Sequence, residues 1–438
     1  MKRTLSLLIA AVLLLTLVPL AVAEDAPVHI RFVNYWVKEE MTYTYPADLV
    51  DAYLAEHPNV TIDWESYSGS DLQTVVFQTQ AAANDMPDFF MINSLNMRQA
   101  ALGGLLDNWD EILASDPEWR DSMLDNWAET TFNGSVYGIP YQFITNEVLY
   151  YNKEILSRYG YETYPDNWDE VFALGEQMKA DGLVPLAIGN ADGWPLWSHL
   201  GEILSEYYCG PEWVAAIGGY APGSTYDTPE FLKVVQLIQR INAELFNPDA
   251  VAIKANEEVQ SYFFDEDAAA LLGGSWTLGG LESIAPDGFM DKVGVAPIPK
   301  PNDGLDSIPS GIFTGGSGWE YAINTKLASD QLQVAVDLTK IFTGPEFAKG
   351  RLEEGNIPVL KAEYYPEVDA SFLTPQRSAL SDLISAAPRL TLMNQQQQGS
   401  MASVLYKAMQ EVQVATKTPE EAVQSIESSY ASILQSLE

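Results

Sequence analysis

The chain has little cysteine and little histidine. Among its 438 residues there is one cysteine, Cys209, and there are three histidines, His29, His57 and His199. A single cysteine excludes an intramolecular disulfide framework and a cysteine-based zinc cluster. Three separated histidines leave little for a histidine-rich metal site, so we expect no metal. Cys209 itself is expected to be a buried, unreactive thiol.

Positive charge is also scarce. Lys and Arg number 23 against 61 Asp and Glu, which gives a formal net charge of -38. A field of this sign repels nucleic-acid phosphates and anionic membrane surfaces, so we expect no nucleic-acid partner. Hydrophobic residues make up 47% of the chain. That share supplies enough apolar mass for a core and excludes global disorder.

Recognisable catalytic and cofactor motifs are missing. The sequence contains no G-x-x-x-x-G-K-[ST] loop, no H-E-x-x-H, no G-x-G-x-x-G after a strand and no EF-hand spacing. The segment 315–318 resembles part of a nucleophile elbow, but Trp319 stands where the last Gly is needed, so we interpret it as a Gly-rich loop. We therefore expect that the protein binds no cofactor and is not an enzyme. Glycoside hydrolysis needs only two suitably spaced carboxylates, which keeps a secreted glycoside-active enzyme as an alternative.

The first 23 residues have the pattern of a cleavable signal peptide. A basic start is followed by an apolar run, 5–18, and by the small residues 21–23. Their removal takes away Lys2 and Arg3 and no acid, so the net charge becomes -40. No cysteine follows the expected cleavage site for lipid attachment. We expect export to a periplasmic or extracellular location and a soluble mature chain, because no second apolar run of about 18 residues occurs.

Strand-like and helix-like segments alternate along the mature chain. This order predicts βαβ units and a mainly parallel sheet, with ligands beyond the carboxyl ends of its strands. A capping box, Thr418 to Glu421, marks the start of the last helix. The expected strands are 29–37, 60–64, 88–92, 147–152, 185–189, 268–272 and 293–296, and the expected helices are 46–57, 72–83, 167–181, 229–242 and 418–434.

Tryptophans gather at the junctions where expected strands end. Trp36, Trp194, Trp197 and Trp276 occupy such places, and Trp319 follows the Gly-rich segment 315–318. An indole offers a flat apolar face that fits the C–H face of a pyranose, while nearby amides and carboxylates bind hydroxyls. The pattern favours an aromatic site for a sugar.

Several segments, in this order, resemble the solute-binding proteins of bacterial ABC sugar importers, the extracellular family 1 that includes maltose-binding protein. They are Y-G-I-P-Y (137–141), V-L-Y-Y-N-K-E (148–154), P-D-N-W-D-E (165–170), A-A-A-L-L-G-G-S-W (268–276), V-G-V-A-P-I-P (293–299), F-T-G-P-E-F (342–347), G-N-I-P (355–358) and K-T-P-E-E-A (417–422). Asn167 stands where the family usually has Thr.

The resemblance implies an α/β, two-lobe periplasmic-binding-protein fold of type II, with a ligand cleft between lobes joined by three crossings. The crossings would be Tyr141–Asn146, Val293–Pro299 and Gly355–Val359. The implied lobes are 24–142 plus 297–355 for lobe 1 and 146–293 plus 358–438 for lobe 2.

The same resemblance, together with the tryptophan pattern, suggests the ligand contacts. The maltose-binding branch has carboxylates and an Arg at the third-strand and first-crossing positions, where this chain has Asn, Ser and Thr, so maltose is not implied. The expected contacts are Trp36, Asn93, Ser94, Tyr141, Thr145, Asn146, Trp194, Trp197, Trp276 and Trp319.

The expected function is capture of a carbohydrate, an oligosaccharide, and its delivery to the transmembrane permease subunits of an ABC transporter. The chain is expected to act as a monomer. Besides the glycoside-active enzyme, a binding protein for a non-sugar solute such as a polyamine or peptide remains an alternative, because a dense acidic surface attracts cations.

Overall fold

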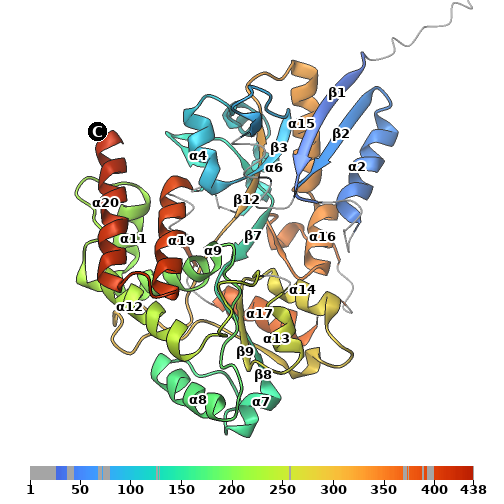
Figure 1. The fold of residues 1–438 in the computed structure, drawn as a ribbon. Helices are drawn as coiled ribbons and strands as arrows, with labels where there is room; N and C mark the ends of the chain where they lie inside the picture. The colour runs from blue at the N-terminus through green and yellow to red at the C-terminus, as the bar shows by residue number, and fades with distance from the viewer. Residues whose placement is uncertain are drawn as a thin grey trace, which may run out of the picture.

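A computed structural model describes most of the mature chain (Figure 1). The predicted signal peptide and half of the predicted helix 72–83, residues 73–78, lie outside the described residues. Over the part that is described, no helix is both long enough and apolar enough to span a membrane. The described residues are 26–36, 44–67, 72, 79–124, 127, 129–255, 258–367, 372, 374–386, 389–391 and 399–437.

The first sheet has five strands and carries the N-terminal lobe. β1 pairs in parallel with β2 and β3, and β12 closes the sheet by running antiparallel to β3 and β6. β3 is buried at every position, as expected for a strand covered on both faces. In sheet order the strands are β2 (Val60–Ser66), β1 (Val28–Asn34), β3 (Phe89–Asn93), β12 (Trp319–Ile323) and β6 (Ile139–Pro140).

Helices pack on this sheet and enclose the first-lobe core, which consists of buried side chains from 28–141 and 321–359. A proline in the first turn helps to start α2, as the sequence predicts. The helices are α2 (Tyr45–Glu56), α4 (Ser94–Leu102), α5 (Asp110–Ser115), α6 (Pro117–Ser122), α15 (Ser329–Phe342) and α16 (Pro345–Glu353), and a small hairpin joins β4 (Thr131–Phe132) to β5 (Ser135–Val136).

The second sheet, β10 (Val293–Ala296), β8 (Val148–Asn152) and β9 (Ala270–Gly273), is antiparallel throughout. The prediction of a mainly parallel sheet is wrong here, because β9 runs back toward the start of β8. Alternate side chains of β8 enter different cores: Leu149 and Tyr151 pack in the second-lobe core (149–312 and 401–430), and Tyr150 packs in a smaller core on the other face.

Three predicted helices of the second lobe, α8, α12 and α20, begin directly after a capping residue. Asn167 accepts a bond from Glu170 N at 3.0 Å, and Thr228 accepts one from Phe231 N at 3.1 Å. Glu421 and Thr418 form the predicted capping box. The helices are α7 (Lys153–Arg158), α8 (Trp168–Ala180), α9 (Trp194–Leu196), α10 (Glu202–Cys209), α11 (Pro211–Gly218), α12 (Pro229–Glu244), α13 (Gln260–Phe264), α14 (Thr277–Ile284), α17 (Pro375–Ala386), α19 (Gly399–Gln413) and α20 (Pro419–Leu437), with a π-helix η2 (Trp197–Gly201) and 3-10 turns η3 (Met290–Lys292) and η4 (Ala362–Tyr364).

Two smaller sequence predictions have mixed outcomes. The segment 185–189 is buried, as expected, but it does not form the predicted strand. It makes only isolated parallel bridges, such as the one from Ala187 to Leu271. Cys209 is half-buried at the end of α10, and burial raises the pKa of its thiol, so the thiol stays protonated.

A third sheet, of four short strands, is built around the predicted crossings. Two predicted crossings lie side by side as β7 (Gln142–Thr145) and β13 (Ile357–Pro358), and β11 (Phe313–Gly316) and β14 (Arg389–Thr391) complete the sheet β13-β7-β11-β14. The glycines 315 and 316 lie in strand β11, not in the loop that we predicted. Residues 298–312 contribute to the second-lobe core, which favours moving the predicted crossing from 293–299 to β11. The lobe boundaries remain a prediction.

Candidate functional site

An aromatic group stands at the end of β1 in the first lobe. The rings of Tyr35 and Trp319 meet edge to face at 5.3 Å, and those of Trp36 and Tyr141 at 5.9 Å. The hydroxyls of Tyr35 and Tyr141 are hydrogen-bonded to each other. Trp36 and Tyr141 are buried, whereas Tyr35 and Trp319 are only half-buried. Tyr35 and Trp319 are therefore the accessible members of this group.

The predicted polar contacts Asn93 and Ser94 lie beside these rings, because Asn93 pairs with Trp319 across β3 and β12. Both are engaged inside the protein. The Asn93 side chain caps α4 by accepting a bond from Asn96 N at 3.2 Å. Ser94 Oγ donates to the Glu320 carboxyl at 2.7 Å. In this conformation, the two residues shape the site from within.

Two carboxyl groups, Glu129 and Glu320, share the hydroxyls of Ser94 and Ser317 in a buried cluster. Ser317 N also donates to Glu129 at 3.1 Å. Burial raises the pKa of Glu129 to about 7, and burial together with the Glu129 charge raises the pKa of Glu320 to about 8. A Cβ on Gly316 would lie 1.6 Å from a Glu129 oxygen. Gly316 is therefore needed to make room for this carboxyl group.

A third buried carboxyl group, Glu147, joins two crossing strands. It accepts bonds from Thr314 N of β11 at 3.1 Å and from Thr145 Oγ1 of β7 at 3.0 Å. Burial raises the pKa of Glu147 to about 8. The hydrogen bonds from Thr314 and Thr145 lower this pKa, but their effect is smaller than that of burial. The predicted contact Thr145 thus holds the crossing together through Glu147.

A second aromatic group, in the second lobe, consists of Trp194, His199 and Trp276. The ring of His199 lies 5.2 Å from that of Trp194 and 6.1 Å from that of Trp276, and the two indoles are 6.2 Å apart. Both indoles are half-buried. Trp276 follows the carboxyl end of β9, as predicted. We call these three residues the aromatic platform.

The aromatic platform is fixed to the first crossing. Ser275 N donates to Thr145 O at 2.8 Å, and His199 Nδ1 donates to the backbone oxygen of Asn146. Tyr141 of the first-lobe group precedes Asn146 by five residues, which corresponds to about 17 Å of backbone in an extended strand. The crossing therefore carries one aromatic group at each end.

Trp197 does not join either group. Its side chain is fully buried in the second-lobe core, with its ring 6.1 Å from that of Phe231. Gly201 leaves the space that this indole fills, since a Cβ there would lie 2.2 Å from the ring. This placement argues against the predicted role of Trp197 as a ligand contact.

The two lobes touch beyond the crossings, where α4 contacts α19 (Figure 1). The guanidinium of Arg98 on α4 lies 4.9 Å from the ring of Phe132 and 5.5 Å from the ring of Tyr220 in the second lobe. Such cation–π contacts contribute about 0.5–1 kcal/mol at exposed sites. The described conformation is thus one in which the lobes are in contact.

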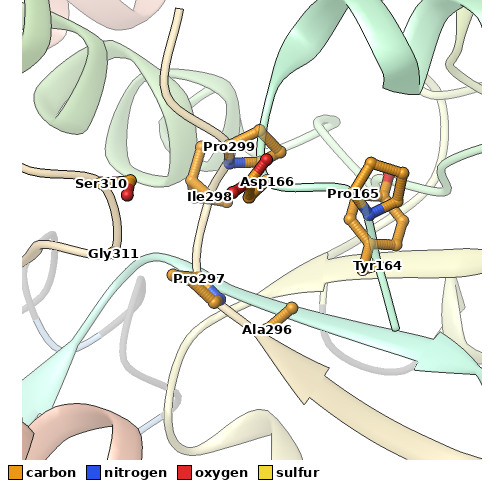
Figure 2. A pocket seen from close by; sticks show the side chains of 9 residues that line it. All are labelled: Tyr164, Pro165, Asp166, Ala296, Pro297, Ile298, Pro299, Ser310 and Gly311. Carbon is orange, nitrogen blue, oxygen red and sulfur yellow. The ribbon is translucent and has the colours of Figure 1, made fainter. Parts of the chain in front are cut away.

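A small cavity opens elsewhere on the second lobe, between Tyr164–Asp166 and Ala296–Pro299 (Figure 2). Its volume is about 120 Å³. Ligand pockets usually measure about 300–1,000 Å³, and none of the predicted site residues lines this cavity. We do not assign it to the main ligand.

Sequence reasoning missed several residues that shape these groups. Tyr35 precedes a tryptophan that was selected, and His199 follows Trp194 within the same segment, so their position gave a partial signal. Glu129, Glu147 and Glu320 had no such signal, because 61 acidic residues look alike until the fold buries a few of them, these three included.

Comparisons with known proteins agree with this architecture. Residues 36–347 match the family described as "Bacterial extracellular solute-binding protein". An uncharacterized ABC transporter extracellular-binding protein of Pyrococcus horikoshii is 25% identical over 60% of this chain and 57% of its own. The multiple sugar-binding protein of Streptococcus mutans is 26% identical over 40% of this chain and 39% of its own. The chain thus spans little more than half of the first relative and less of the second.

A solved structure of a chitin oligosaccharide binding protein superposes with a TM-score of 0.83 at 20% identity, over 93% of this chain and 99% of that one. This likeness and the family match confirm the predicted two-lobe α/β fold of type II.

Proposed function

The chain belongs to the bacterial extracellular solute-binding proteins, and we propose that it captures a carbohydrate, an oligosaccharide, for an ABC importer. The family match carries the binding role. The sugar is inferred from the aromatic platform and from relatives whose names refer to sugars.

The observation that carries the proposal is the pair of half-buried indoles, Trp194 and Trp276, with centroids 6.2 Å apart on one lobe. Their apolar faces suit the C–H faces of sugar rings. A second pair of half-buried rings, Tyr35 and Trp319, stands near the other end of the first crossing. Two aromatic groups at the two ends of one crossing fit a chain of sugar units better than a single ring.

Capture would use closure of the lobes. The short crossing strands allow rotation, and the contact between Arg98 and Tyr220 exists only while the lobes meet. A ligand that touches both lobes favours the closed state, because it binds that state more tightly. Release to the permease subunits would follow reopening, with the sugar chemically intact and the binding protein acting as a monomer after export.

A titration with product analysis tests this function. The mature protein is titrated by calorimetry with chitotriose, xylotriose, maltotriose, a polyamine and a tripeptide, and each mixture is analysed for cleavage after long incubation. We expect saturable binding of one oligosaccharide class without products. If only the polyamine or the tripeptide binds, the ligand is a non-sugar solute. Steady cleavage of an oligosaccharide would favour the glycoside-active enzyme.

X-ray scattering with and without the bound oligosaccharide tests closure. The radius of gyration should fall at saturation. An unchanged radius would contradict the two-state mechanism while leaving the binding result intact.

A further inference from the structure

One side chain of the aromatic platform, His199, has an unusual position. It lies in the π-helix η2, Trp197–Gly201, directly after α9. Single π-turns are rare and occur frequently at functional sites. The wide turn buries Trp197 in the core and at the same time brings His199 against Trp194 and Trp276.

The imidazole of His199 is held in one tautomer. The Nδ1–H group donates a hydrogen bond to the backbone oxygen of Asn146 in the first crossing. Burial lowers the pKa of His199 to about 4, although the bond to Asn146 raises it, so the ring is neutral above pH 5. A neutral ring that carries its proton on Nδ1 has a lone pair on Nε2.

Nε2 has no hydrogen-bond partner among the described residues. It is also not among the unpartnered side-chain atoms that are sealed from solvent. Because the two nitrogens lie on different edges of the ring, Nε2 points away from the crossing. The platform therefore combines two indole faces with one hydrogen-bond acceptor.

We propose that His199 Nε2 accepts a hydrogen bond from a hydroxyl of the sugar that stacks on Trp194 and Trp276. This inference rests on the proposed function and adds a specificity-determining residue to it. An acceptor at this place selects a sugar with a free hydroxyl over one whose hydroxyl is methylated or absent. It also makes binding depend on the neutral ring, so protonation below about pH 4 would turn the acceptor into a donor.

Imidazole nitrogen NMR tests the tautomer without any ligand. The chain has only three histidines, and the other two, His29 and His57, are not buried, so the His199 signals can be assigned with a His199→Asn spectrum. We expect a neutral ring protonated at Nδ1 from pH 5 to pH 8. A ring protonated at Nε2, or charged at pH 6, would overturn the inference whatever the protein binds.

Binding measurements test the contact itself, with chitotriose, xylotriose and maltotriose as probes. The Nε2 signal should shift when the preferred trisaccharide binds. His199→Asn keeps a donor for the Asn146 backbone oxygen but places no acceptor at the Nε2 position, so affinity should fall about fivefold to thirtyfold. His199→Gln, which places an amide oxygen near the Nε2 position, should retain more affinity than His199→Asn.

The outcomes separate the two proposals. Wild-type affinity in folded His199→Asn, or an Nε2 signal that the bound sugar leaves unchanged, would refute the role of His199 and leave the sugar-binding function standing. If both variants unfold, the Nε2 shift in the wild-type protein decides. Failure of every trisaccharide to bind would overturn the proposed function and this inference with it.

Discussion

Replacement of Trp276 by Ala is the sharpest test of the aromatic platform. The indole is half-buried and lies next to Trp194 and His199. A tryptophan side chain has about 150–250 Å² of surface, and a sugar stacked on one face covers roughly 80 Å² of it. At about 25 cal/mol per Å², the lost contact is worth about 2 kcal/mol, a weakening of roughly thirtyfold.

Trp168→Ala is the matched control. Trp168 starts α8 in the same lobe, is 3% exposed and packs beside Phe172. In Figure 1, α8 lies well apart from α9, the helix that starts with Trp194. Its loss should reduce the free energy of unfolding by about 3–5 kcal/mol and leave the affinity of the folded protein nearly unchanged. Trp276→Ala should show the opposite pattern, with a large loss of affinity and a smaller loss of stability.

Calorimetric titration and thermal unfolding of both variants decide the matter. Near-wild-type affinity in folded Trp276→Ala would remove this residue from the site. A loss of stability as large as that of Trp168→Ala, with intact affinity, would mean that the indole packs under its loop.

Three further predictions concern the crossings and the contact between the lobes. Burial raises the pKa of Glu147 to about 8, above its ordinary 4.5, so the folded state holds a proton more tightly, and the free energy of unfolding should fall as pH rises from about 4.5 to 8; Glu147→Gln should make the melting temperature fall less steeply over this range, the rest of the fall coming from Glu129 and Glu320, and pH curves parallel to those of the wild type would contradict this role. Gly316→Ala should lower the melting temperature, because its Cβ would collide with Glu129, whereas Gly280→Ala in α14, whose Cβ would meet only Gln260 at 3.4 Å, should not; equal effects would refute this. Arg98→Ala should weaken ligand binding about twofold to fivefold by removing the contact to Tyr220 from the closed state, and scattering of the unliganded variant should report a larger radius; unchanged affinity would show that the contact does not bias closure.

Much of the fold follows from local sequence signals. Asn167, Thr228 and Thr418 each cap the helix that the sequence predicts, because a side-chain oxygen before a helix satisfies a free backbone N–H. The direction in which a strand pairs with its neighbour has no comparable local signal in the sequence. The antiparallel pairing of β8 with β9 depends on how residues 153–269 return the chain to the crossing. Alternation of strands and helices alone does not encode that return.

The sequence likewise indicated some residues of the candidate site and not others. Trp194 and Trp276 were found because each follows a strand-like segment, and Trp319 because it follows a Gly-rich segment; the structure leaves all three partly accessible. Trp197 fits the same pattern but turns into the core, because the π-helix changes the direction of its side chain. The turn that withdraws Trp197 also delivers His199. A sequence pattern with a period of 3.6 residues cannot report a turn that is one residue wider, so the residue that we assign to specificity became visible only in the folded chain.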